Sequence, residues 1–142
     1  MSNHEIDVSD PARPTRLKGT VQSFLAAAYG GKIEDAKRYL TEDLHLEIAG
    51  SSPVSGTRSG PDAFFENFRR MLELTENTYT MTEQTDWCAS MDRVVLVATE
   101  QTTKDGKLLT FRRAVIYRFC SELIDQISVY ELDPDVAAAA FG

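Results

Sequence analysis

The stretch of sequence that decides the fold is residues 94–119, which read VVLVATEQTTKDGKLLTFRRAVIYRF. Apolar residues recur at alternate positions on both sides of the Asp105-Gly106 pair. An Asp-Gly pair between two alternating runs is a strong signal for a two-residue β-hairpin turn. The stretch therefore predicts two long antiparallel strands, 94–103 and 108–119, with Lys104 opposite Lys107.

The periodicity changes on moving outward from this hairpin. In three segments before residue 73, apolar residues recur every three or four positions, which is typical of helices. In a short segment between the second and third of these, and in the segments directly before and after the hairpin, apolar and other residues alternate, which is typical of strands. The expected helices are 15–29, 33–40 and 61–72, and the expected strands are 44–48, 78–87 and 123–132. Residues 50–60 are rich in Gly, Ser and Pro and predict a loop, and the alanines of 137–140 predict a terminal turn of helix. This order predicts an α+β cone, in which a curved, mainly antiparallel sheet wraps around three helices and encloses a pocket.

Length and composition are those of one globular domain, which we place at 15–142 after a flexible arm at 1–14 that carries two prolines. The net charge of −7 argues against nucleic acid and anionic membranes as partners. No apolar stretch is long enough to span a bilayer, and the polar N-terminus shows no signal peptide. Cys88 and Cys120 are expected to be buried thiols in a reducing compartment, which favours a cytoplasmic location.

No cofactor is expected from the sequence. Its histidines and acids do not fall at metal-ligand spacing, so no metal site is predicted. Its glycines do not lie in a phosphate-binding loop between a strand and a helix, so no nucleotide site is predicted either.

Several short motifs carry a family resemblance over about residues 17–133. They are Val21-Gln22-Ser23-Phe24-Leu25, Gly31-Lys32-Ile33-Glu34, Leu40-Thr41-Glu42-Asp43, Pro53-Val54-Ser55-Gly56 and Tyr117-Arg118-Phe119. With them the chain resembles the SnoaL-like branch of the nuclear transport factor 2 superfamily, which includes ketosteroid isomerases, polyketide cyclases and epoxide hydrolases. The resemblance implies the cone fold with its internal pocket, and it leaves the activity open because this fold hosts many unrelated functions.

The resemblance also implies where the catalytic groups of relatives would fall. The carboxylate base of the isomerases corresponds to Ile48, their tyrosine donor to Phe24 and their protonated acid to Val115. The acid of the polyketide cyclases corresponds to Ser128. The epoxide hydrolases have an Asp two residues after an Arg on a pocket strand, whereas here Val115 stands two residues after Arg113. These departures argue against all three chemistries, and ketosteroid isomerase activity should be absent or very weak.

The alternation of strand residues sorts side chains onto two faces of the sheet. If Val115 points inward, as the resemblance implies, so do Arg113 and Tyr117, and the hairpin pairing puts Glu100 diagonally beside Arg113. On the last strand the same reasoning places Gln126, Ser128 and Tyr130 inward.

Glu100 and Arg113 are the candidate catalytic residues, because an acid and an arginine in an apolar concavity must pair with each other or with a ligand. Arg113 would hold a carboxylate, enolate or carbonyl oxygen, and Glu100 would act as a general base. The alternative is a buried ion pair that only fixes the sheet. The expected ligand-binding residues are Tyr130, Gln126, Ser128, Tyr117, Trp87, Phe24, Ile48 and Val115.

Two functions remain open. One is a cofactor-independent isomerase, cyclase or dehydratase acting on a hydrophobic oxygenated metabolite. The other is a non-catalytic ligand-binding or dimeric partner module. Because Val95, Val97, Ala114 and Ile116 make the outer face apolar as well, a homodimer through the convex face of the sheet is expected.

Overall fold

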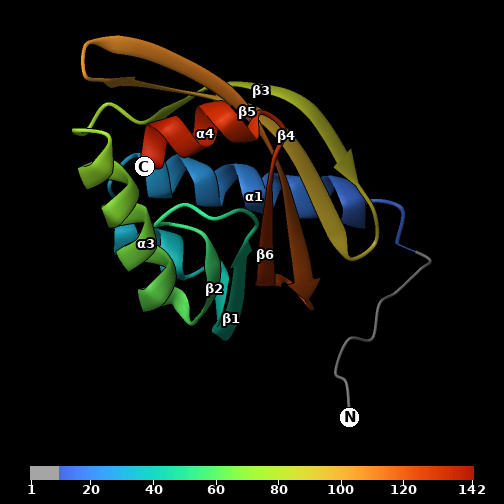
Figure 1. The fold of residues 1–142 in the computed structure, drawn as a ribbon. Helices are drawn as coiled ribbons and strands as arrows, with labels where there is room; N and C mark the ends of the chain where they lie inside the picture. The colour runs from blue at the N-terminus through green and yellow to red at the C-terminus, as the bar shows by residue number, and fades with distance from the viewer. Residues whose placement is uncertain (1–9) are drawn as a thin grey trace.

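The computed structural model describes residues 10–142 and contains one six-stranded sheet with four helices. The strand order is β2-β1-β6-β5-β4-β3. The strands are β1 Leu40–Ile48, β2 Gly56–Ser59, β3 Thr80–Ala89, β4 Arg93–Lys104, β5 Lys107–Cys120 and β6 Leu123–Glu131. The helices are α1 Arg13–Tyr29, α2 Ile33–Lys37, α3 Pro61–Leu74 and α4 Pro134–Phe141. Figure 1 shows β3, β4 and β5 arching over α1 and α4, while α3 stands beside β1 and β2.

The expected α+β architecture with a mainly antiparallel sheet is confirmed. Only β1 and β6 pair in parallel, and the other neighbouring strands are antiparallel. The parallel pair arises because β6 returns beside the first strand after the whole antiparallel meander, in the same direction.

Several element boundaries differ from the sequence prediction, and the second helix, expected at 33–40, ends at Lys37. The strand expected at 44–48 begins at Leu40, so Thr41-Glu42-Asp43 continue the strand where a break was expected. The loop expected at 50–60 contains β2, which folds back onto β1 with Ile48 opposite Gly56. The alanine run forms most of α4, a fourth helix, because Pro134 starts it and Phe141 anchors it in the core.

The N-terminal arm is shorter than expected within the described residues. Residues 1–9 of the predicted arm lie outside the described part of the chain. Helix α1 begins at Arg13, two residues before Thr15, and the Arg13 side chain is buried. Its guanidinium donates hydrogen bonds to the carbonyl oxygens of Met91 and Ser121 and pairs with Glu122, so α1 is fastened to two turns of the sheet.

The central hairpin folds as the sequence predicts. Asp105 and Gly106 both have positive φ, as the turn requires, and Lys104 pairs with Lys107. Glu100 consequently pairs with Phe111, and Ala98 pairs with Arg113. The expected placement of Glu100 and Arg113 on one inner face is confirmed, since both side chains are almost fully buried.

The last strand contains a bulge that reverses its faces. Arg118 pairs with Gln126, but its neighbour Phe119 pairs with Ile124, so Asp125 is an extra residue in β6. Beyond the bulge, Ile127 lies opposite Tyr117 and Val129 lies opposite Val115, and these four side chains share the inner face. The inward placement predicted for Gln126, Ser128 and Tyr130 is therefore wrong, because one extra residue moves each side chain to the other face.

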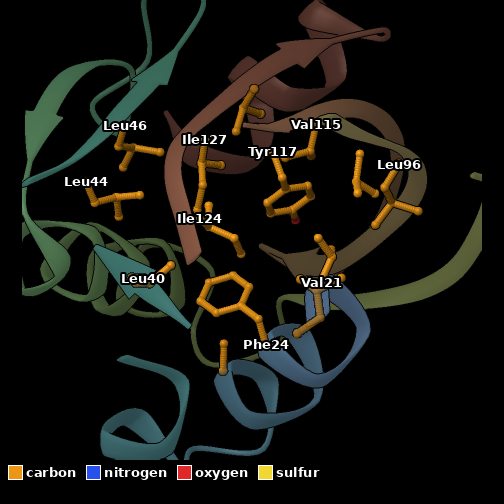
Figure 2. Packing of buried hydrophobic residues seen from close by; sticks show 14 of the residues in the cluster. Val21, Phe24, Leu40, Leu44, Leu46, Leu96, Val115, Tyr117, Ile124 and Ile127 are labelled. Atoms are coloured by element: carbon orange, nitrogen blue, oxygen red, sulfur yellow. The ribbon is translucent and has the colours of Figure 1, made fainter. Parts of the chain in front are cut away.

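The core lies between α1 and the inner face of the sheet. Figure 2 shows Val21 and Phe24 of α1 pointing toward the sheet residues Tyr117 and Ile127.

In the part of the chain that the structure describes, no helix is long and apolar enough to cross a membrane. Cys88 is exposed and Cys120 is half-buried, so the expectation that both thiols are buried is wrong.

Candidate functional site

A cavity of about 60 Å³ lies between α1, α3 and the inner face of the sheet. Its wall is mainly apolar, with a few polar side chains gathered on it. The lining residues are Phe24, Leu25, Ala28, Tyr29, Leu46, Ile48, Phe64, Asn67, Phe68, Met71, Tyr79, Met81, Glu100, Arg113, Val115, Tyr117, Ile127 and Val129. Six of the ten residues selected from the sequence are among them, namely Phe24, Ile48, Glu100, Arg113, Val115 and Tyr117.

The other four selected residues do not line this cavity. Gln126, Ser128 and Tyr130 lie on the convex face, where the Gln126 amide donates a hydrogen bond to Ser128 Oγ over 3.1 Å. Trp87 lies opposite Leu96 and packs at the edge of the core, with the Lys18 ammonium 5.4 Å from its ring centre. Trp87 therefore belongs to the structural core between α1 and β3.

The polar end of the cavity is centred on Arg113. The guanidinium of Arg113 lies near the side-chain oxygens of Glu131, Tyr79 and Glu100. Its Nε lies 3.1 Å from both carboxylate oxygens of Glu131, and its Nη2 lies 2.9 Å from Glu131 Oε2. Its Nη1 donates to the Tyr79 hydroxyl over 3.0 Å and lies 3.9 Å from Glu100 Oε1. The guanidinium also lies over the ring of Phe141, with 5.6 Å between its central carbon and the ring centre.

Two tyrosines complete this polar cluster from the helical side and the sheet edge. The Tyr29 hydroxyl donates to Glu100 Oε2 over 3.3 Å and lies 3.3 Å from the Tyr79 hydroxyl. The polar cluster is defined here as Tyr29, Tyr79, Glu100, Arg113 and Glu131. Its members come from α1, the segment before β3, and strands β4, β5 and β6, so five parts of the chain position it.

Sequence reasoning missed Tyr29, Tyr79 and Glu131. Tyr29 follows Leu25 by four residues on the apolar stripe of α1, so the helical periodicity held a usable signal. Glu131 was hidden by the bulge in β6, and Tyr79 precedes β3 in a segment without clear periodicity. In β6 itself, Ile127 and Val129 are apolar while Gln126 and Ser128 are polar. This pattern indicated that Ile127 and Val129 lie on the inner face of the sheet.

Burial changes the proton affinities in the polar cluster. Burial raises the pKa of Glu100, and this outweighs the opposing effects of the nearby Arg113 cation and the tyrosine hydroxyls. Burial lowers the pKa of Arg113, but the surrounding Tyr79, Glu131 and Glu100 raise it overall, so the guanidinium keeps its charge. Burial also raises the pKa of Tyr79 and of Tyr29, and the Glu100 charge adds to both shifts. The cluster therefore combines the Arg113 cation, which lies closest to Glu131, with a glutamate and two tyrosines whose pKa values burial raises.

Asn67 on α3 is a further polar residue of the cavity wall, and its side-chain amide makes few hydrogen bonds. Its side chain is buried, and its Nδ2 has only a weak contact with Met71 Sδ at 3.9 Å. Its Oδ1 is buried without a hydrogen-bond partner among residues 10–142. A buried carbonyl oxygen without a donor costs free energy, so a ligand that donates a hydrogen bond there would relieve that cost.

Within residues 10–142, no group of three or more His, Cys, Asp or Glu side chains is placed to hold a metal ion. The wall of the described cavity presents an acid, tyrosines, an amide and a guanidinium. A charged donor and hydroxyl groups beside a carboxyl of raised pKa can bind a carbonyl or hydroxyl oxygen and move a proton near it.

Comparison with known proteins gives a family and a fold. The family model of the SnoaL-like domain matches residues 21–127. No match is found among curated proteins. The structure of Bal32a from a soil-derived mobile gene cassette is similar, with a TM-score of 0.84 and 19% identity over 92% of this chain and 99% of that one. A Xanthomonas campestris protein of unknown function with a cystatin-like fold has a TM-score of 0.81 and 19% identity over 89% of this chain and 98% of its own.

A third similar structure is that of TerC co-crystallised with polyporic acid. It has a TM-score of 0.76 and 15% identity, and the match covers 89% of this chain and 97% of that one. At these identities the three structures establish a common fold.

Proposed function

Because the chain belongs to the SnoaL-like domain family, we propose that it binds a hydrophobic oxygenated small molecule in the cavity and performs cofactor-independent acid–base chemistry on it. The family includes enzymes that act on small molecules. The observation that carries the proposal is the buried polar cluster at the end of an apolar cavity, with Glu100 and Arg113 both lining the wall. TerC, which shares the fold, was co-crystallised with the organic molecule polyporic acid.

The charge balance of the cluster favours an uncharged ligand oxygen. Arg113 is already paired closely with Glu131, so a ligand carboxylate would add an uncompensated negative charge to a buried site. A carbonyl oxygen instead accepts hydrogen bonds from the Tyr79 hydroxyl and from the guanidinium without changing the net charge. The proposed ligand is thus a ketone, aldehyde, quinone or alcohol with an apolar body.

The proposed reaction is proton transfer beside that carbonyl. The Glu100 carboxylate takes a proton from the neighbouring carbon, and the C–H electron pair forms the C=C bond of an enolate. Tyr79 and Arg113 stabilise the enolate oxygen. If the ketone carries a β,γ double bond, return of the proton from Glu100 to the γ-carbon completes an isomerisation. If it carries a β-hydroxyl, the C–O bond breaks and the leaving oxygen takes the proton from Glu100 to form water, which completes a dehydration. The raised pKa of Glu100 makes its carboxylate a stronger base than an ordinary glutamate.

The second candidate is binding without catalysis, and a specific observation favours it. The cavity of about 60 Å³ is smaller than the roughly 150 Å³ apolar cavity that holds benzene. Aromatic rings fill much of the surrounding space, with Phe24 and Phe64 5.6 Å apart and Tyr29 and Phe68 5.2 Å apart. In this alternative the polar cluster anchors a ligand or stabilises a dimeric module.

Deuterium exchange separates the two candidates. 4-Phenylbutan-2-one, a neutral ketone with acidic C–H groups, is incubated with the protein in D₂O, and proton loss is followed by NMR. The proposal expects exchange that is at least tenfold faster than buffer and that disappears in Glu100→Gln. The matched control is Glu83→Gln, a change of an exposed carboxylate on β3, which should leave the rate unchanged. Binding without exchange favours the second candidate.

A cytoplasmic location and a homodimer through the convex face belong to the same proposal. The two cysteines are free, as in a reducing compartment. Val95, Val97, Ala114 and Ile116 on the convex face are only half-buried, and a second copy of the chain packed on them would cover this apolar strip.

A further inference from the structure

The small cavity adjoins a larger groove on the helical side of the molecule. This groove measures about 490 Å³ and lies between the end of α1, α2, α3 and the start of β3. Its lining residues are Ala28, Tyr29, Gly31, Ile33, Lys37, Asp62, Phe65, Glu66, Phe68, Arg69, Leu72, Tyr79 and Thr80. Ala28, Tyr29, Phe68 and Tyr79 also line the cavity, so these side chains form the wall between the two spaces.

The wall is held by contacts that a ligand can replace. The rings of Tyr29 and Phe68 meet edge to face with 5.2 Å between their centres. The Tyr29 hydroxyl reaches Glu100 and Tyr79 over 3.3 Å each, which is at the long end for hydrogen bonds between oxygens. If the Tyr29 side chain turns away, the cavity joins the groove, and the Glu100 carboxyl gains space for another oxygen.

The groove has an apolar floor and a rim whose charges are already compensated. Ile33, Phe65 and Leu72 supply apolar surface. On the rim, Lys37 lies 2.8 Å from Asp62 and 3.1 Å from Glu34, and Arg69 pairs with Glu66. Since these charges neutralise each other, the groove suits an uncharged apolar group better than an ionic one.

We propose that the groove is a second subsite, which holds the apolar body of the ligand whose oxygen occupies the cavity. This inference rests on the proposed function of the cavity. The cavity alone accommodates little more than a carbonyl group and its nearest atoms, whereas the adjoining groove has room for one or more rings. The ligand class is therefore an elongated, uncharged amphiphile with a carbonyl or hydroxyl group at one end.

A pair of ketones with the same head tests this subsite. Butan-2-one and 4-phenylbutan-2-one are titrated into the full chain, and the dissociation constants are measured by NMR. Burial of the phenyl ring in the groove should make 4-phenylbutan-2-one bind roughly tenfold to a hundredfold more tightly. In Leu72→Gln and in Thr80→Trp, which respectively make the groove polar and fill it, this gain should shrink to about threefold or less, with butan-2-one unaffected.

The controls separate this inference from the proposed function. Leu108→Gln makes the same change at a residue that is 64% exposed on the central hairpin and should keep the full gain. Thr80 is exposed, so Thr80→Trp tests the groove even if Leu72→Gln fails to fold. Weaker binding of both ketones in Tyr79→Phe supports the cavity as the head site. If 4-phenylbutan-2-one keeps its full affinity advantage over butan-2-one in both groove variants, the subsite inference is wrong and the proposed function stands. If neither ketone binds the protein, both proposals are wrong.

Discussion

Arg113 and Glu131 face each other directly across β5 and β6, with Arg113 Nη2 2.9 Å from Glu131 Oε2. Glu100 lies farther from the same guanidinium, 3.9 Å from Nη1 to Oε1. Arg113 is therefore neutralised mainly by Glu131, and Glu100 is left with a raised pKa beside a cation that is already paired. This division of roles decides which oxygen chemistry the cavity can support.

A double-mutant cycle should reveal the Arg113–Glu131 pair. Replacing either partner alone leaves a buried charge without compensation, so Arg113→Met and Glu131→Gln should each destabilise the protein by about 3–5 kcal/mol. The double variant should be more stable than the sum of the two single changes predicts, by about 1–3 kcal/mol. Urea unfolding measures all four proteins, and strictly additive losses would contradict the pairing.

The pH dependence of stability should report Glu100. Because its pKa is raised in the folded state, Glu100 contributes fully to stability below its unfolded pKa, and this contribution falls as the pH rises toward the folded pKa. Glu100→Gln removes this dependence. Its stability relative to the wild-type protein should increase above about pH 4.5 by as much as about 1.4 kcal/mol per pH unit. A difference between the two proteins that stays constant from pH 4 to pH 8 in urea unfolding would refute the raised pKa.

The unsatisfied amide of Asn67 should lower stability. Asn67→Leu replaces a buried amide, whose Oδ1 receives no hydrogen bond, by an apolar side chain of similar size, and should stabilise the fold by about 1–3 kcal/mol. The same variant should bind 4-phenylbutan-2-one no more tightly than the wild-type protein. The midpoint of urea unfolding checks the first expectation. A lower midpoint would mean that the amide has a structural role that the described contacts do not reveal.

The convex face supplies a prediction about assembly. Ile116→Glu places a charge on the apolar strip and should convert the proposed homodimer into a monomer. Gln22→Glu, a matched addition of charge on the exposed side of α1, should leave the assembly unchanged. Light scattering at micromolar concentration gives the mass. A wild-type protein that is already monomeric would remove the dimer from the proposal.

The parts of the fold that local patterns control were predictable from the sequence. The Asp105-Gly106 turn sets the pairing of β4 with β5, and that pairing places Glu100 and Arg113 on one face of the sheet. The family resemblance, which put Val115 inward, identified that face as the inner one. Helical periodicity likewise put Phe24 on the apolar side of the first helix, and the family resemblance identified it as a pocket residue, which lines the cavity. These features depend on short stretches in which every residue supports the same structure.

The rest of the site depended on long-range pairing that the sequence pattern does not encode. One extra residue, Asp125, moved Ser128 and Tyr130 to the convex face and brought Glu131 to Arg113. The contribution of Tyr79 follows from how the chain enters β3 beside α1. The parallel pairing of β1 with β6 joins the β1–β2 pair to the other four strands and could be seen only in three dimensions.

A crystal structure of the protein with 4-phenylbutan-2-one would show whether the polar cluster receives the oxygen of a neutral ligand. The ketone oxygen should lie about 3 Å from the Tyr79 hydroxyl, the Glu100 carboxyl or Arg113 Nη1, with the Tyr29 ring displaced. A ketone bound elsewhere, with Tyr29 still in contact with Glu100 and Tyr79, would contradict this expectation.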